Sequence, residues 1–251
     1  MQIIVTATIK GGTGKTTTAA ALAQCAASKG KKVLCVDMDA QGDFSYFIGG
    51  DLTRRGAYDA IHGADISDCI QTTAQGVDLI AGSSDLATET TANNSAMRLR
   101  AALEPLKKKY DFILIDTPPQ LGELTFNALE CATGLLIPLE ADNSSLQGLY
   151  QITDLARQIK TTNPGLKNCG CIITRYDQRP KINRFLHDAI RDNAREQGAP
   201  LLMAIRPGVS VRESQALQRS LYDYAPRSNP AQDYDRLFSA ISGKKWQVLE
   251  Q

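Results

Sequence analysis

The sequence has few of the residues that build metal sites and disulfide frameworks. It contains two isolated histidines, His62 and His187, and its six cysteines form no C-x-x-C pair. We therefore expect no zinc site and interpret the cysteines as free thiols of a reducing compartment. No apolar run reaches the length of a membrane span, and the chain starts directly with a predicted strand rather than a signal peptide. These absences favour a cytoplasmic protein.

A strong excess of charge of one sign is also missing. The formal net charge of +1 gives the whole chain no general attraction to nucleic acid. The charges are unevenly distributed, because residues 1–90 carry 7 Lys/Arg and 10 Asp/Glu, whereas residues 175–227 carry 10 and 6. This basic last third is as typical of a solvated helix face as of a surface that binds a polyanion.

A glycine-rich segment follows the first apolar run. Residues 10–17 read Lys-Gly-Gly-Thr-Gly-Lys-Thr-Thr. The glycines allow consecutive backbone N–H groups to surround an anion, and the positive end of the helix predicted next points at the same place. Lys15 is expected to bind the β- and γ-phosphates of a nucleotide, and the Thr16 hydroxyl to ligate Mg²⁺. The loop is a variant, since Ile9 occupies the position of the usual first glycine and Lys10 adds a second lysine.

The same segment partly fits a dinucleotide-binding fingerprint. Gly12 and Gly14 have the required spacing, and the acidic Asp37 follows about 20 residues later. The position of the third glycine holds Thr17, however, and a pyrophosphate loop has no use for the Lys-Thr-Thr run. We therefore interpret the segment as a triphosphate loop.

Apolar, β-rich runs alternate with longer helical patterns along the chain. This alternation predicts an α/β fold with a doubly wound, mainly parallel sheet and helices on both faces, in one domain that spans residues 1–251. The predicted strands are residues 3–9, 33–37, 77–81, 112–116, 135–139, 171–174 and 201–205. Helices are expected between most of them, for example at residues 17–28, 96–109, 145–160 and 182–196.

Acidic residues stand at the ends of two predicted strands. Asp37 and Asp39 follow one strand, and Asp116 ends another. Because ligands of such sheets bind at the carboxyl ends of the strands, we expect these side chains on the rim that holds the phosphate loop. A few carboxylates, with phosphate oxygens and water, are what Mg²⁺ requires beside a nucleotide.

These blocks together resemble a known family. Residues 10–17, 37–43, 111–129, 205–214 and 223–234 are similar, in the same order, to segments of the ParA/MinD group of deviant Walker P-loop ATPases, most closely the ParA/Soj-type partition proteins. The resemblance implies a weak ATP hydrolase that uses ATP and Mg²⁺ and forms a homodimer in the ATP state. It also implies non-specific binding to double-stranded DNA, association with the nucleoid, and stimulation by a ParB-like centromere-binding protein during plasmid or chromosome partition.

The resemblance also implies roles for individual residues. Lys10 matches the lysine that reaches the partner's nucleotide, Asp39 the residue that positions the attacking water, and Asp116 the residue that holds Mg²⁺ through water. Lys10, Lys15 and Asp39 are thus the expected catalytic residues, and Thr16, Asp39 and Asp116 the expected metal site. The expected nucleotide contacts are Lys10, Gly11, Gly12, Thr13, Gly14, Lys15, Thr16, Thr17, Gly122, Thr174, Arg175, Arg206 and Pro207.

The chain departs from the family pattern at two places. Ala40 stands where proline usually follows the second aspartate, and Arg206-Pro207-Gly208 reverses the usual Pro-Arg-Asn order beside the adenine. Basic residues of the last third are the candidates for contacts with DNA phosphates, namely Arg179, Lys181, Arg184, Arg206, Arg212 and Arg219.

Three relatives of different function remain as alternatives. A MinD-like membrane-cycling ATPase would need an amphipathic C-terminal helix, and residues 243–249 are short for that purpose, so membrane binding is not expected. A relative of the nitrogenase iron protein would need a cysteine pair, and Cys131 has no companion at the expected place. A bacterial tyrosine kinase would end in a tyrosine-rich tail, which this chain does not have.

Overall fold

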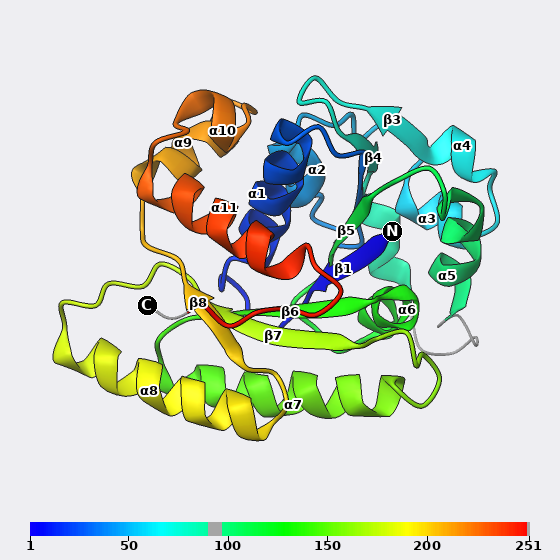
Figure 1. Ribbon diagram of the computed structural model, residues 1–251. Helices are drawn as coiled ribbons and strands as arrows, with labels where there is room; N and C mark the ends of the chain where they lie inside the picture. The colour runs from blue at the N-terminus through cyan, green and yellow to red at the C-terminus, as the bar shows by residue number, and fades with distance from the viewer. Residues whose placement is uncertain (90–96, 250–251) are drawn as a thin grey trace.

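The computed structural model describes residues 1–89 and 97–249, and these form one eight-stranded sheet with helices on both faces (Figure 1). The strand order is β3-β4-β2-β5-β1-β6-β7-β8, and every pair is parallel except β3–β4. The predicted doubly wound fold is confirmed. The strands are β1 (Gln2–Thr6), β2 (Val33–Asp37), β3 (Ile70–Thr72), β4 (Asp78–Ile80), β5 (Phe112–Asp116), β6 (Gly134–Leu139), β7 (Asn168–Ile173) and β8 (Leu201–Ala204).

The helices occupy the connections between the strands. They are α1 (Lys15–Ser28), α2 (Asp43–Phe47), α3 (Ala57–Ile61), α4 (Ile66–Cys69), α5 (Arg98–Leu103), α6 (Glu123–Cys131), α7 (Asn143–Ile159), α8 (Lys181–Glu196), α9 (Val209–Ala216), α10 (Leu221–Tyr224) and α11 (Asn229–Ile241), with short 3₁₀ turns η1 (Ser84–Thr88) and η3 (Glu104–Leu106). One face of the sheet packs against α1, α2, α10 and α11, and the other against α3, α5, α6, α7 and α8.

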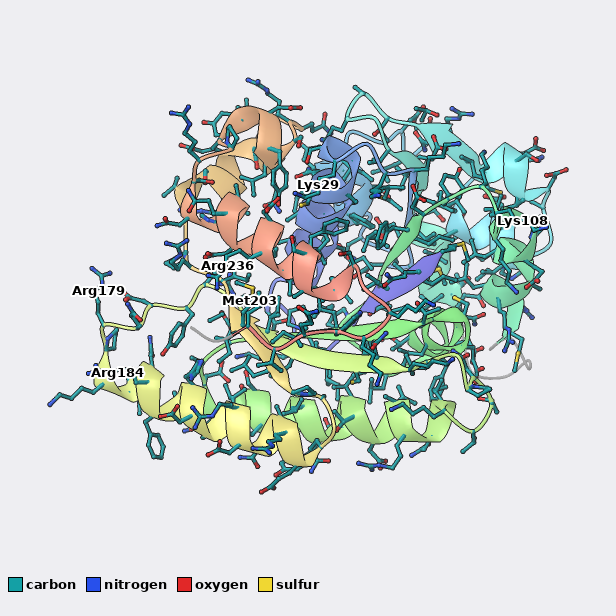
Figure 2. All side chains as sticks on the ribbon, viewed as in Figure 1. Lys29, Lys108, Arg179, Arg184, Met203 and Arg236 are labelled. Carbon is teal, nitrogen blue, oxygen red and sulfur yellow. The ribbon has the colours of Figure 1, made fainter. Side chains whose placement is uncertain are left out.

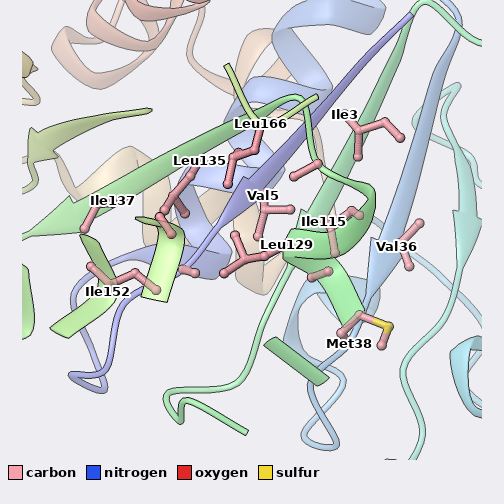
Figure 3. Close-up of a cluster of buried hydrophobic side chains, with 14 of the residues drawn as sticks. Ile3, Val5, Val36, Met38, Ile115, Leu129, Leu135, Ile137, Ile152 and Leu166 are labelled. Carbon is pink, nitrogen blue, oxygen red and sulfur yellow. The ribbon is translucent and has the colours of Figure 1, made fainter. Parts of the chain in front are cut away.

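Alternating strand side chains supply the two apolar cores. In β1, Val5 packs into the core beneath α6 and α7, whereas Ile4 packs into the core beneath α1. Figure 3 shows Val5 beside Ile115 of β5 and Leu129 of α6, whereas Ile152 of α7 lies nearer to Ile137 of β6. All of these residues are fully or almost fully buried. Burial on both faces explains why these strands are apolar throughout.

Two of the expected elements end or begin clearly elsewhere in the structure, and the short strand β3 was not expected. The first strand ends at Thr6 rather than at residue 9, because the following residues already turn into the phosphate loop. The helix expected at 96–109 is shorter: its first residue, Ala96, lies outside the described residues, and α5 gives way to a 3₁₀ turn at Glu104. Pro105 explains this change, since it removes a backbone donor and clashes with the preceding helical turn.

Strand register brings three side chains to one rim of the sheet. Thr6, at the end of β1, and Asp37, at the end of β2, both stand level with Asp116 at the end of β5. The chain then leaves each strand towards the same side, which is where the phosphate loop lies.

The C-terminal segment packs on the body of the protein. The amide of Leu249 donates to the carbonyl of Leu202 in β8 (2.9 Å), and the ring of Trp246 lies over Gly134, where a Cβ atom would collide with it. Within residues 1–89 and 97–249, no helix combines the length and the apolar character needed to cross a membrane.

Candidate functional site

The loop between β1 and α1 has the shape of an anion cradle. Gly12 (φ 76°) and Gly14 (φ 88°) adopt left-handed backbone conformations that side chains with a Cβ rarely allow, and Gly14 is the residue before the first turn of α1. At Gly11 and Gly12, an added Cβ would meet no heavy atom within 4 Å, so the loop surrounds open space. Its free backbone donors and the helix N-terminus are directed at this space.

Thr174 and Arg175, at the end of β7, hold the loop in place. The Thr174 hydroxyl lies 2.7 Å from the carbonyl oxygen of Thr13 and 3.1 Å from that of Leu139. The Arg175 guanidinium donates to the carbonyl oxygen of Gly12 and pairs with Glu140. Both residues were expected to contact the nucleotide, and the structure gives them a second role as supports of the loop.

The expected metal ligands Thr16 and Asp116 lie in contact. The Thr16 hydroxyl donates to the Asp116 carboxylate (2.6 Å), and the Thr6 hydroxyl donates to its other oxygen (3.1 Å). Burial, followed by the nearby Asp37 charge, raises the pKa of Asp116 to about 8, although Thr16, Lys15 and Thr6 act in the opposite direction. A carboxyl group in this environment gains from a nearby cation.

The buried ammonium group of Lys15 lies near Thr16 and Asp116. The residue is only 6% exposed and forms no ion pair with any described residue. Burial lowers its pKa, while the charges of Asp116 and Asp39 oppose this shift. A buried cation without a direct partner favours an anionic ligand.

Lys15 and Thr16 line one cavity of about 500 Å³, and Asp116 lies buried behind Thr16. Its walls include Gly11, Gly12, Lys15, Thr16, Asp39 and Gly122, together with residues of the segments that follow β2 and β5. Strands β1, β2 and β5 therefore bring most of the residues expected to bind phosphates and metal into one chamber.

Asp37 stands at the same rim but serves the fold. Its fully buried carboxylate accepts hydrogen bonds from the amide (2.9 Å) and hydroxyl (2.7 Å) of Ser45 and from the amide of Asp39 (3.0 Å). These bonds order the segment between β2 and α2 and so position Asp39 at the cavity. Asp37 thus lies on the expected rim, but its carboxylate is used inside the fold, and of the two aspartates after β2 only Asp39 lines the cavity.

Lys10 has two acidic partners that were not expected from the sequence. Its ammonium pairs with Asp142 and, at 3.4 Å, with Glu140. Although burial raises the pKa of Asp142, hydrogen bonds from Lys10, Ser144 and Ser145 lower it to about 2. Both acids follow β6 directly, so the reasoning from strand ends that selected Asp116 could also have found them.

A second cavity, of about 460 Å³, lies on the other side of the phosphate loop. Gly14 and Thr17 of the loop line it, together with Thr174, Arg175, Arg206, Pro207, Val209, Val211, Gln215 and Tyr234. Four of the expected nucleotide contacts, Thr174, Arg175, Arg206 and Pro207, thus share one chamber. The Arg206 guanidinium is engaged with the buried Asp233 at 2.7 and 2.8 Å, so the backbone and stem of this residue are left to face a ligand.

The expected DNA contacts fall into two groups at one edge of the molecule. Arg179, Lys181 and Arg184 surround the start of α8, and Figure 2 shows Arg179 and Arg184 projecting away from the body. The others belong to the segment from Arg206 to Arg219. Arg179 pairs with Asp177, Arg206 with Asp233, and Arg219 lies over the ring of Tyr224. Lys181, Arg184 and Arg212 have no ion-pair partner in the described ranges.

A family model and a protein of known sequence match most of the chain. The family model described as AAA domain matches residues 1–168. The chain is 33% identical over 242 residues to the sporulation initiation inhibitor protein Soj of Bacillus subtilis (strain 168), an alignment that covers 93% of this chain and 95% of Soj.

Two solved structures are similar over almost the whole chain. Cobyrinic acid a,c-diamide synthase from Mycobacterium smegmatis, with bound ATP analogue and magnesium, has a TM-score of 0.85 and 26% identity and covers all of both chains. A putative plasmid partition protein from Borrelia burgdorferi B31, bound to AMPPNP, has a TM-score of 0.76 and 27% identity and covers 93% of this chain and 95% of that one.

Proposed function

The chain belongs to the ParA/Soj family of P-loop partition ATPases, and from this premise we propose that it is a single-domain ATPase whose nucleotide state controls dimerisation and DNA binding. The observation that carries the proposal is the chamber lined by the glycine loop, the buried Lys15 and Thr16, whose hydroxyl donates to the buried Asp116 behind the chamber wall. Its residues fit a nucleoside triphosphate with Mg²⁺, because the glycine loop, the Lys15 ammonium, which pairs with no described residue, and the Asp39 carboxylate line one chamber, with Asp116 directly behind Thr16.

Different groups of the protein would bind the phosphates, hold the metal ion and orient the attacking water. The loop amides and Lys15 hold the phosphates and neutralise their charge. The Thr16 hydroxyl and the carboxylates of Asp116 and Asp39 would hold Mg²⁺, which, when bound, offsets negative charge that develops on the phosphate oxygens. Asp39, on the segment fixed by Asp37, would also orient the attacking water. Gly122, at the start of α6, would contact the terminal phosphate through its backbone N–H. In the second cavity, Pro207 and Tyr234 would flank the base.

We propose that dimerisation uses Lys10. In the single chain, Glu140 and Asp142 hold its ammonium at the rim of the sheet, where it is about one-third exposed. A nucleotide on a second copy, approaching this rim, would offer a stronger anionic partner. Exchange of Lys10 from the two carboxylates to the partner's phosphates would then link nucleotide binding to dimer formation.

DNA binding is proposed for the basic edge that carries Arg179, Lys181, Arg184, Arg206, Arg212 and Arg219. Lys181, Arg184 and Arg212, which have no ion-pair partner in the described ranges, would be the first to contact phosphates, and none of the set would read the sequence. A dimer would present this edge twice, which compensates for the small net charge of the chain. A ParB-like protein bound to a centromere-like site would stimulate hydrolysis and release the DNA-bound form from the nucleoid.

The experiment that tests the proposal is retention of arbitrary-sequence duplex DNA on filters with ATP, with ADP and without nucleotide, at two salt concentrations. We expect retention with ATP only, weaker retention at higher salt, and none for Lys10→Ala. Arg184→Ala should weaken retention, whereas Lys108→Ala, an exposed lysine on the far side of the molecule (Figure 2), should not. Binding to anionic liposomes instead of DNA would favour the membrane-cycling alternative, and ATP-independent DNA binding would contradict the proposed switch.

A further inference from the structure

A separate cavity of about 330 Å³ lies at the opposite end of the sheet from the phosphate loop. It is formed by the start of β1, by α5, by the end of α6 and by the turn before β7, which adjoin in Figure 1. Ile3, Leu103 and Ala132 give it an apolar wall, and all three are buried. None of the residues assigned to nucleotide, metal or DNA lines this cavity.

Glu130 contributes a buried carboxyl group to the cavity. The residue is only 4% exposed, and one of its oxygens, Oε1, accepts a hydrogen bond from the Thr162 hydroxyl. The other oxygen, Oε2, is buried and has no hydrogen-bond partner among the residues that the structure describes. Because a buried polar oxygen without a donor is costly, this position favours a ligand that brings N–H groups.

Positive charge flanks the same cavity. Arg100 and Lys107 of its rim come from α5 and the turn that follows η3. Lys107 is already paired with Glu104. Arg100 has no ion-pair partner in the described part of the chain, and its guanidinium is free to bind a carboxylate. The cavity therefore has an acceptor buried in its wall and a cation at its rim, neither with a partner among the described residues, beside an apolar surface.

We propose that this cavity is a binding site for a free α-amino acid with an apolar side chain. Its ammonium group donates to Glu130, its carboxylate faces Arg100, and its side chain packs against Ile3 and Leu103. A simple amine would be repelled by Arg100 and a simple carboxylate by Glu130, so the two opposite charges together select a zwitterion.

The helix that carries Glu130 links this cavity to the nucleotide chamber. α6 begins after Gly122, and its first residues, Glu123 and Leu124, line the phosphate-side cavity, whereas Glu130 and Cys131 at its other end line this one. A ligand that fixes the end of α6 therefore acts on the segment that would contact the terminal phosphate. This effect on ATP turnover rests on the proposed function, whereas binding of the amino acid does not.

Calorimetric titration of the full chain with L-leucine, as the probe, tests the site. We expect saturable binding at millimolar concentrations. Leucinol, which lacks the carboxylate, and 4-methylpentanoate, which lacks the amine, should each bind about tenfold more weakly. Glu130→Gln retains an oxygen for the Thr162 hydroxyl and should also weaken binding about tenfold. The matched control Glu196→Gln, at an exposed position of α8, should bind leucine as the unmodified chain does.

Two results would overturn the site itself. One is the absence of saturable leucine binding, and the other is equal affinity of Glu130→Gln and the unmodified chain while thermal melting shows both to be folded. Leucine binding without any change in ATP turnover would overturn only the coupling through α6. A chain that binds leucine but hydrolyses no ATP would contradict the proposed ATPase and leave the amino-acid site supported.

Discussion

The hydroxyl of Thr174 lies 2.7 Å from the main-chain carbonyl of Thr13, and this contact ties the end of β7 to the phosphate loop. Thr13 is almost fully buried. Thr174→Val keeps the shape of the side chain but leaves that carbonyl without the hydroxyl donor, at a cost of about 1–3 kcal/mol. We expect lower stability in urea unfolding and weaker ATP binding. Thr174→Ser keeps the hydroxyl and should restore both; equal ATP affinity of Val and Ser variants would contradict the supporting role.

The two aspartates after β2 are predicted to differ sharply when changed to asparagine. Asp37→Asn disturbs three hydrogen bonds of a buried carboxylate and should lower the free energy of unfolding by about 1–3 kcal/mol. Asp39→Asn retains an oxygen for the Gln41 amide, so its stability should change by less than about 0.5 kcal/mol. Its Mg²⁺-dependent ATP turnover should nevertheless fall by about 100-fold or more. Urea unfolding measures the stability and phosphate release measures the ATP turnover. A large loss of stability in Asp39→Asn with unchanged stability in Asp37→Asn would contradict the structural role of Asp37.

The stabilisation that the Asp142–Lys10 pair gives to the folded protein should disappear at low pH. The folded pKa of Asp142 is about 2, below the ordinary value of about 3.9. The stabilisation is therefore complete above about pH 4 and is lost as the pH falls through about 2. The unfolding free energies of the wild type and Asp142→Asn should differ at pH 6, by about 1 kcal/mol or less because the site is partly exposed, and converge near pH 2. Asp154→Asn, at an exposed ion pair of α7, should show no such convergence.

The thiols should be unreactive in the folded protein. Burial raises the pKa of Cys25 to about 11 and those of Cys131 and Cys169 to about 12, so almost no thiolate exists at neutral pH. We expect iodoacetamide to leave these three residues unmodified at pH 7 and to modify them after unfolding in urea, as read by mass spectrometry of peptides. Rapid modification of Cys131 in the folded state would show that its surroundings open in solution.

Much of the architecture could be predicted because it depends on local patterns. Buried parallel strands need continuous apolar residues, so β2 and β5 were predicted at their observed bounds. Strand register then carries Asp116 to the loop, as expected from the shared rim of a parallel sheet. β3 escaped prediction because it is three residues long and pairs with β4 at the sheet edge, where neither length nor alternation gives a signal.

The missing features of the site depend on contacts between distant segments. Lys10 meets Asp142 across more than a hundred residues, and although the acid follows a strand, no spacing in the sequence points to Lys10 as its partner. By position after the strand, Asp37 and Asp39 look equivalent. The family resemblance singled out Asp39, and the hydrogen bonds from Ser45 show why Asp37 is structural. Thr174 was expected beside the nucleotide, but only the fold shows that its hydroxyl faces the loop.

The central claim is that the rim of Lys10 and the phosphate loop becomes a dimer interface when nucleotide is bound. The most direct test is the solution mass by light scattering with a non-hydrolysable ATP analogue and Mg²⁺, compared with ADP. We predict twice the mass of one chain with the analogue, one chain with ADP, and one chain in both conditions for Lys10→Ala. A single-chain mass of the unmodified protein with the analogue, or a doubled mass of Lys10→Ala, would contradict the claim.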